Sequence, residues 1–297
     1  MLLAPPPPIV DVRPTLELRT ASPVNEVTVD NGLAATLVGE TPSWEYILVW
    51  SPKGVVVRPT LACDLQESNI VLAGDRLAHI CNEVGENTVL TATFKRPRSV
   101  PQLHTAGFVA LAGQGSLIAG SAGSTLWRFD PKGKVKLGTF PGSILVFNVD
   151  GNRILVGRTN TVLEIVSRTG KAMSTLKIPH VGGALLRGSS IASIANHRFV
   201  LSNLRGKALR SGPVVGDATL MDASPELVVY SVGIRLHLLR LRDGRNVTLR
   251  FKGQFGYASA KLSDGALFYA YNVGGGSSKP GRAGFVTAAG VQALLRG

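Results

Sequence analysis

The sequence lacks any uninterrupted apolar run as long as the roughly 18 residues that mark a membrane-spanning helix. It also lacks a long amphipathic helical pattern and the Gly-x-Ser-x-Gly element that positions the serine of α/β-hydrolases. These absences exclude a helical membrane-spanning protein and disfavour a serine peptidase. With 44% hydrophobic and 17% charged residues, the chain is too apolar to be disordered. We therefore expect a soluble globular protein.

Cysteine and histidine are scarce, with two cysteines and five histidines in 297 residues. None of them shows the close spacing of a zinc site or of a helix-borne metal motif. The sequence therefore predicts no metal and no cofactor. At this point Cys63 and Cys81 have two interpretations, a single disulfide in an oxidising compartment or two buried free thiols.

Acidic residues are scarce in the second half of the chain. Residues 1–148 hold 12 Lys and Arg against 12 Asp and Glu, whereas residues 149–297 hold 20 against 7. The formal net charge of +13 therefore originates in the second half. Glycine (34) and proline (17), in contrast, are abundant without collagen periodicity, which predicts many tight turns.

These turns belong to an internal repeat of two hairpins. A first hairpin, formed by two apolar runs around a tight turn, is clearest in residues 27–35, 71–78 and 146–156. The turns of the second hairpin lie at Lys53-Gly54, Lys95-Arg96, Lys132-Gly133, Thr169-Gly170, Arg205-Gly206, Asp243-Gly244 and Ala289-Gly290. Two hairpins in roughly 40 residues are typical of a four-stranded propeller blade.

The repeat predicts an all-β fold, a seven-bladed β-propeller of four-stranded antiparallel blades, with a six-bladed propeller as the alternative. We expect residues 26–297 to form the propeller domain and residues 1–25 a Pro-rich N-terminal extension. The strands before the second turns are apolar on both faces, as expected for blades stacked face to face. The residues just before those turns are mostly small and polar, and such side chains can accept hydrogen bonds from turn N–H groups. They are Ser51, Thr93, Asp130, Ser167, Asn203, Leu241 and Thr287.

Residues 126–135, Leu-Trp-Arg-Phe-Asp-Pro-Lys-Gly-Lys-Val, contain a strand, an Asp-x-x-Gly turn and a second strand. This element resembles the recurrent unit of bacterial secreted or periplasmic β-propeller repeat proteins of the TolB-like and WD-like superfamily. The Gly-His and Trp-Asp dipeptides of WD-repeat propellers are missing. The resemblance covers nearly the whole chain from about residue 26. It implies an extracellular, periplasmic or cell-envelope location, with the signal segment absent from this chain, and it implies no catalytic residues.

Propeller topology assigns the repeat positions to faces of the ring. Loops between the second and third strands of each blade lie on the same face as the connections between blades, and we call this face the loop face. Ligands of propellers generally bind there, at the mouth of the central channel. The candidate ligand-binding residues in these loops are Glu83, Glu86, Arg158, His197 and Tyr271. Cys63 and Cys81 approach the same face at neighbouring strands, which favours a disulfide between them.

The second hairpins of the third to sixth units carry an arc of basic residues on the outer edge of the ring. Its members are Lys132, Lys134, Arg168, Lys171, Arg205, Lys207, Arg210, Arg242 and Arg245. We call these nine residues the basic arc. It suits a protein or an anionic cell-envelope polymer, although charge on edge strands also resists aggregation between sheets. Aromatic residues make up only 6% and do not alternate with these cations, which disfavours nucleic acid.

A non-catalytic binding or assembly role is the function that these patterns favour. The alternative is a hydrolase, lyase or lactonase with its site at the channel mouth. A glycan-binding propeller is a second alternative, which the three tryptophans disfavour because they cannot supply one stacking platform per blade. Glu164 lies in an otherwise apolar strand, and we expect it to form a structural ion pair, for example with Arg128.

Overall fold

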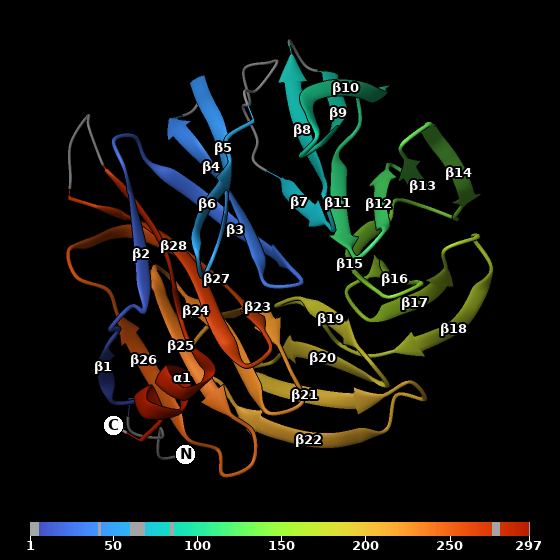
Figure 1. Cartoon of the computed structure of the whole chain (residues 1–297). Helices are drawn as coiled ribbons and strands as arrows, with labels where there is room; N and C mark the ends of the chain where they lie inside the picture. Colours follow the sequence, from blue (N-terminus) through green and yellow to red (C-terminus); the bar gives the residue numbers. More distant parts are fainter. Residues whose placement is uncertain (1–5, 41–42, 60–68, 84–85, 275–279, 297) are drawn as a thin grey trace.

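The strands of the chain form seven separate sheets that stand around a central axis (Figure 1). The computed structural model describes residues 6–40, 43–59, 69–83, 86–274 and 280–296, with side chains described at all of these positions except 40, 43–45, 82–83 and 96–99. Six sheets have four strands and one has five. The predicted seven-bladed propeller of four-stranded antiparallel blades is therefore confirmed, and the six-bladed alternative is wrong.

Each blade is ordered from an innermost to an outermost strand. Blade 1 contains β3 (Val24–Asp30), β4 (Leu33–Glu40), β5 (Ser43–Ser51) and β6 (Gly54–Val57), and blade 2 contains β7 (Ile70–Ala73), β8 (Arg76–Glu83), β9 (Glu86–Thr93) and β10 (Arg96–Thr105). Blade 3 contains β11 (Val109–Gln114), β12 (Leu117–Ala122), β13 (Thr125–Asp130) and β14 (Gly133–Thr139), and blade 4 contains β15 (Leu145–Asp150), β16 (Arg153–Thr159), β17 (Val162–Ser167) and β18 (Ala172–Lys177). Blade 5 contains β19 (Ala184–Arg187), β20 (Ser190–Ala195), β21 (Arg198–Asn203) and β22 (Ala208–Pro213), and blade 6 contains β23 (Ala218–Ala223), β24 (Leu227–Val232), β25 (Arg235–Arg240) and β26 (Asn246–Arg250). Blade 7 contains β27 (Gln254–Ser263), β28 (Ala266–Val273) and β29 (Gly281–Val286).

Residues near the N-terminus complete the last two blades. Strand β2 (Leu16–Thr20) pairs antiparallel with β29 and is the fourth strand of blade 7. Strand β1 (Ile9–Asp11) pairs in parallel with β26 and is the fifth strand of blade 6. Segments from the two ends of the chain thus lie side by side in one sheet, and this pairing closes the ring (Figure 1).

The second hairpin expected at Ala289-Gly290 is wrong. Helix α1 (Ala288–Leu294) occupies this position, and the Thr287 hydroxyl caps it by accepting a hydrogen bond from the Gly290 N–H at 3.2 Å. The blade does not need a fourth strand here because β2 supplies it from the other end of the chain. Val291 of α1 is fully buried and packs in the apolar cluster between blades 6 and 7.

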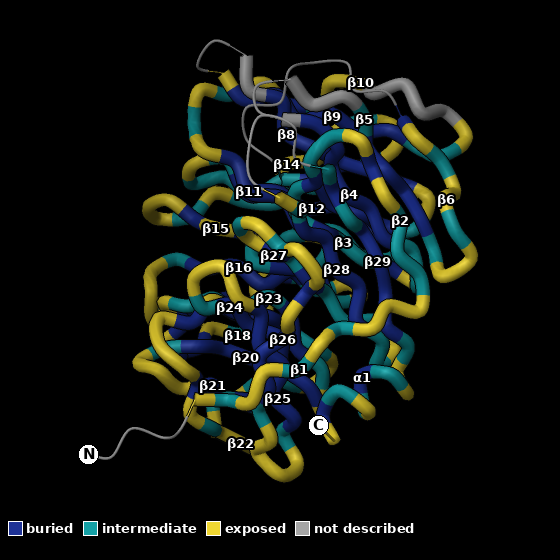
Figure 2. The backbone as a smooth tube through the Cα atoms, turned by 90° about the vertical axis from the view of Figure 1, so that its left-hand side faces the viewer, coloured by how far each residue is buried: buried dark blue, intermediate teal, exposed yellow. Residues whose placement is uncertain are grey.

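The hydrophobic core consists of seven clusters, one between each pair of adjacent blades. Neighbouring residues of one strand therefore enter different clusters. Ile47 of β5 packs between blades 1 and 2, whereas Leu48 packs between blades 1 and 7. This explains why these strands are apolar on both faces. Figure 2 shows the buried strands, with the exposed residues at turns and on outer strands.

The turns use the residues that the sequence pattern indicated. Asn31 and Gly32 both have positive φ angles, 49° and 73°, as a two-residue hairpin turn requires. In the second hairpins, Ser51 accepts a hydrogen bond from the Lys53 N–H at 3.2 Å. Asn203 accepts hydrogen bonds from the N–H groups of Arg205 and Lys207 at 2.9 and 3.0 Å. The predicted structural role of these small polar residues is confirmed at both positions.

Candidate functional site

The candidate ligand-binding residues of the loop face come from four blades, blades 2, 4, 5 and 7. Glu86 begins β9 and is exposed, and the side chain of Glu83 lies outside the described residues. Arg158 of β16 forms an ion pair with Glu164 at 3.7 Å. His197 precedes β21, and its Nδ1 lies 2.7 Å from the Gly216 carbonyl oxygen. The structure therefore keeps these side chains in separate local contacts.

Tyr271 of β28 is buried, and its hydroxyl donates a hydrogen bond to Glu17 of the closing strand β2 at 3.0 Å. The Tyr269 hydroxyl also lies within hydrogen-bonding distance of Glu17, at 3.3 Å. Burial, reinforced by the nearby Glu17 carboxylate, raises the pKa of both phenols well above their usual range. Both tyrosines therefore stay protonated and bind β2 to blade 7.

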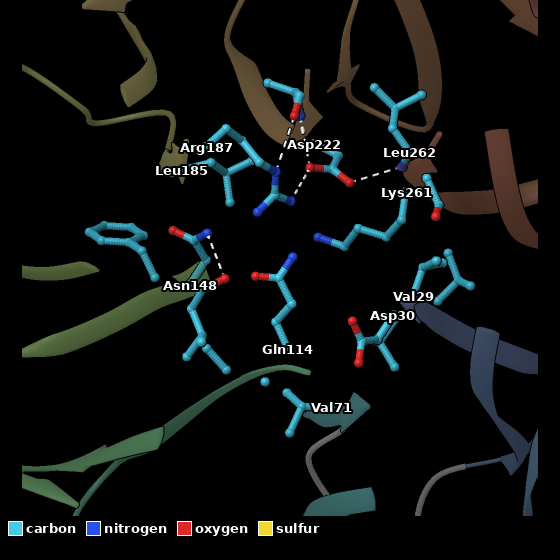
Figure 3. Close-up of a pocket in the computed structure, with 18 of the residues that line it drawn as sticks. Val29, Asp30, Val71, Gln114, Asn148, Leu185, Arg187, Asp222, Lys261 and Leu262 are labelled. Atoms are coloured by element: carbon cyan, nitrogen blue, oxygen red, sulfur yellow. Dashed lines mark hydrogen bonds and ion pairs between the residues drawn. The ribbon is translucent and has the colours of Figure 1, made fainter. Parts of the chain in front are cut away.

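A cavity of about 540 Å³ lies on the axis of the ring, lined by the innermost strands of all the blades (Figure 3). Glu86, Arg158, His197 and Tyr271 are not among its lining residues. The loops that carry them join second and third strands, whereas the innermost strands reach the axis. Ligand binding at these four residues remains a prediction.

Most of the polar side chains around this cavity hold adjacent blades together. Asp30 of blade 1 accepts hydrogen bonds from the N–H groups of Gly74 in blade 2 and Gly115 in blade 3, at 2.6 and 2.8 Å. Asn148 of blade 4 donates to the Leu186 carbonyl at 2.9 Å and accepts from the Leu186 N–H at 2.8 Å. These side chains satisfy the hydrogen-bonding needs of backbone N–H and C=O groups near the axis, which would otherwise need water as a partner.

Asp222 makes the densest of these connections. Its buried carboxylate accepts from Arg187 Nη2 of blade 5 at 2.5 Å and from the Leu262 N–H of blade 7 at 2.8 Å. Lys261, also in blade 7, donates to the Met221 carbonyl at 2.7 Å. Figure 3 shows the amine of Lys261, the guanidinium of Arg187 and the amide of Gln114 pointing toward the middle of the cavity.

Sequence reasoning missed this set of residues around the axis. A signal was present, because Asp30, Gln114, Asn148 and Asp222 are polar residues within mainly apolar first strands. Glu26 is a further example at the loop-face end of β3, where its Oε1 accepts from the Ile70 N–H at 3.0 Å. Burial raises the pKa of the Glu26 carboxyl.

The nine residues of the basic arc lie in the outer hairpins of blades 3 to 6, which are consecutive in the ring. Eight of them are exposed and Arg168 is half-buried. The two carboxylates at the turns of these hairpins form ion pairs with arginines outside the arc. Asp130 pairs with Arg128 at 2.7 Å, and Asp243 pairs with Arg240 at 2.7 Å. Within the described part of the chain, Arg242 is the one arc residue in an ion pair, at 3.9 Å from Asp243.

The ion pair expected between Glu164 and Arg128 is wrong. Glu164 instead pairs with Arg158 of its own blade at 3.7 Å. The Arg128 guanidinium contacts Asp130 on the same strand and donates to the Arg168 carbonyl at 3.0 Å. Arg128 therefore joins blade 3 to blade 4 through a backbone oxygen rather than through Glu164.

The described histidines show no arrangement for binding a metal. Over the ranges that the structure describes, no three His, Cys, Asp or Glu side chains gather as metal ligands would. His79 is buried, and neither of its ring nitrogens has a hydrogen-bond partner among the residues that the structure describes. Burial lowers the pKa of His79 to about 4, and burial together with Arg235 lowers that of His237 to about 4.

The cysteines and tryptophans bear on the remaining sequence predictions. Cys81 of β8 is buried, whereas Cys63 lies outside the described residues, so the disulfide remains a prediction. Trp50 is fully buried, and Trp127 is half-buried with the Lys134 amine 5.4 Å from its ring centroid. Trp50 therefore offers no open face for sugar stacking, and the Lys134 amine lies over the ring of Trp127. The side chain of Trp44 is not described.

Solved structures similar to this chain are β-propellers. The propeller domain of Cps50 (Swd1) from Myceliophteria thermophila matches with a TM-score of 0.64 and 14% identity, over 93% of this chain and 99% of that one. The WD40 propeller domain of Doa1 matches with a TM-score of 0.60 and 13% identity, over 92% and 96%. BamB from Moraxella catarrhalis matches with a TM-score of 0.53 and 11% identity, over 88% and 84%.

The similarity between this chain and these structures is a similarity of fold. Sequence identities this low carry no functional assignment. No protein-family model matches the sequence. The curated proteins likewise include no match. Across the described residues, no helix has the length and apolar character needed to span a membrane.

Proposed function

We propose that this propeller is a non-catalytic binding or assembly module whose basic arc holds an anionic partner, either an acidic protein surface or an anionic cell-envelope polymer. The observation that carries the proposal is the set of cations in four consecutive outer hairpins whose own carboxylates are already paired. Such cations remain available to a partner, and neighbouring positive charges reinforce one another's potential.

The spacing of the arc suits an extended partner. Adjacent blades repeat the same hairpin, so cations recur at Lys132 and Lys134 in blade 3, Lys171 in blade 4, and Arg205 and Lys207 in blade 5. A single phosphate or carboxylate would use one hairpin, whereas a chain of anions can follow several. Binding to such a chain releases counterions and becomes weaker as salt is added.

Charge reversal tests the arc against the alternative that its cations only prevent aggregation. Poly-L-glutamate labelled with a fluorophore is titrated with the protein from about 50 to about 500 mM salt. We expect wild-type affinity to fall steeply with salt, and the double variant Lys132→Glu with Lys207→Glu to bind at least about tenfold more weakly.

The matched control is the variant Lys53→Glu with Lys95→Glu. Both lysines are exposed and lie in the same kind of hairpin, but in blades 1 and 2, outside the arc. We expect this control to bind nearly as well as the wild type. Equal weakening by both variants would mean that net charge alone governs binding, and affinity independent of salt would remove the electrostatic proposal.

A location in the periplasm, the cell envelope or outside the cell is the second part of the proposal. Its support is the resemblance of residues 126–135 to secreted propeller repeats and the disulfide that the sequence predicts between Cys63 and Cys81. Fractionation of cells that produce this protein naturally tests it. Recovery of the protein only in the cytosol, with both thiols free, would contradict this location.

A further inference from the structure

The exposed large apolar side chains are confined to two regions of the described structure. Half of them lie on the outermost strands: Ile9, Val55, Val56, Val100, Val135, Met173 and Leu209. The other half lie on the loop face of blades 3 to 7: Phe108, Leu145, Val181, Val215, Ile234, Phe255 and Tyr257. The second region includes large aromatic side chains, with Tyr257 73% and Phe255 48% exposed.

The loops and strand ends that carry Val181, Val215, Ile234, Phe255 and Tyr257 are bonded to neighbouring elements of blades 5 to 7, and we call these five residues the apolar arc. The Leu220 N–H donates to the Gly182 carbonyl at 2.7 Å, next to Val181. The Val214 N–H donates to the His197 carbonyl at 3.0 Å within blade 5. Gln254 Nε2 donates to the Ile234 carbonyl at 2.8 Å and so joins blades 6 and 7. These bonds hold the loops of the arc against neighbouring strands and loops.

A cleft of about 420 Å³ opens at the end of this arc, where blades 6, 7 and 1 meet. Phe255, Tyr257 and Met221 contribute to its lining. Two of its polar side chains are already bonded to the backbone, because Asn272 Oδ1 accepts from the Val24 N–H at 2.7 Å and Ser259 Oγ accepts from the Val27 N–H at 3.1 Å. An entering side chain would therefore meet mainly apolar contacts.

Positive charge flanks the apolar arc. Four exposed cations stand at the ends of strands next to these loops: Lys177, Arg198, Arg235 and Lys252. The loop residues 178–183, 196–197, 214–217, 233–234 and 251–253 contain one carboxylate, Asp217, which lies 3.9 Å from His197. The charge that complements this surface is negative.

We propose that the apolar arc and its cleft form a second binding site, which takes a peptide segment of a partner protein that combines apolar side chains with flanking carboxylates. An apolar side chain of the segment enters the cleft beside Phe255 and Tyr257. Its carboxylates meet Arg235 and Lys252, which adjoin the arc in sequence and in blades 6 and 7. This site lies on the loop face and does not use the basic arc.

A peptide fits these observations better than the other occupants of an apolar surface. A second copy of the chain would bring the same flanking cations against one another, at an electrostatic cost. A flat bilayer surface would not enter a cleft, and Glu26 is among the residues that line this one. A peptide side chain can enter the cleft while its backbone follows the arc.

Fluorescence anisotropy with three labelled synthetic peptides of equal length tests the site. One combines leucine and phenylalanine with glutamates, the second replaces the glutamates by lysines, and the third replaces the apolar residues by serines. We expect the first to bind at least about tenfold more tightly than either of the others, because it alone matches both the apolar and the charge pattern.

Variants of exposed residues then locate the binding. Tyr257→Ser and Arg235→Glu should each weaken the acidic apolar peptide about tenfold. Met173→Ser is the matched control, since Met173 is 56% exposed but lies on an outermost strand, and it should bind like the wild type. Far-UV circular dichroism confirms that each variant is folded.

Three results would overturn the proposal. The first is failure of the acidic apolar peptide to bind at concentrations up to about the millimolar range. The second is equal binding by the wild type and Tyr257→Ser. The third is a wild type that does not bind the peptide but does form dimers, measured by light scattering, or sediment with phosphatidylserine vesicles, where Tyr257→Ser loses that property. That result would assign the surface to a second copy or to a membrane.

Discussion

Removing the carboxylate of Asp222 should weaken the ring more than any exposed acid can. Asp222 is 2% exposed and accepts hydrogen bonds from Arg187 Nη2 at 2.5 Å and from the Ala223 and Leu262 N–H groups, both at 2.8 Å. Asp222→Ala leaves two backbone donors and one guanidinium without this partner. Each unsatisfied donor costs about 1 to 3 kcal/mol, and breaking a buried ion pair costs about 3 to 5 kcal/mol in total.

We expect Asp222→Ala to lower the free energy of unfolding by about 4 kcal/mol. Urea denaturation followed by tryptophan fluorescence measures it, because Trp50 is fully buried in the native state. Asp217→Ala is the control, since the Asp217 side chain is fully exposed and should contribute less than about 0.5 kcal/mol. A loss below about 1 kcal/mol for Asp222→Ala would refute the idea that these inner-strand side chains hold the blades together.

Three further predictions concern pH, the cysteines and ring closure. Because burial lowers the pKa of His79 to about 4, the folded state resists protonation of this ring, so stability is full above pH 6.5 and falls as the pH drops toward 4. In urea denaturation, the free energy of unfolding of the wild type should fall by about 3 kcal/mol more than that of His79→Leu between pH 6.5 and 4. Equal decreases in the two proteins would contradict the assignment of this pH dependence to His79. Mass spectrometry of unreduced, alkylated protein should find Cys63 and Cys81 unmodified, and reduction should lower stability by about 3 kcal/mol; two alkylated thiols would exclude the disulfide. Deleting residues 1–21 removes β1 and β2 and leaves β29 unpaired at the edge of blade 7. The melting temperature should therefore fall, whereas an unchanged melting temperature would support a dispensable N-terminal extension.

The blades could be predicted because their signals are local. Turn residues such as Asn31-Gly32 recur in each unit of roughly 40 residues, and side chains such as Asn203 bond to the turn that immediately follows them. The closure of the ring has no comparable signal. Leu18 pairs with Ala283, and nothing in the short β2 segment indicates which distant strand it will join. The helix at Ala288–Leu294 was missed for the same reason, since the missing fourth strand comes from the other end of the chain.

The interior of the channel was harder to predict than its blades. Asp30 and Asp222 accept hydrogen bonds from backbone N–H groups of neighbouring blades. Such contacts between blades leave no periodic pattern in the sequence. The loops between second and third strands were expected to converge on the channel. Arg158 and His197 instead make contacts within or near their own blades, because strand order sets their distance from the axis.

Protection of lysines from acetylation tests the proposed anionic partner most directly. The protein is treated with an amine-reactive reagent with and without bound poly-L-glutamate, and each lysine is quantified by mass spectrometry. Lys132, Lys134, Lys171 and Lys207 of the basic arc should be protected by the polymer, whereas Lys53 and Lys95, exposed in equivalent hairpins of blades 1 and 2, should react at unchanged rates. Uniform protection of all six lysines, or protection of the two controls alone, would contradict the basic arc as the binding surface.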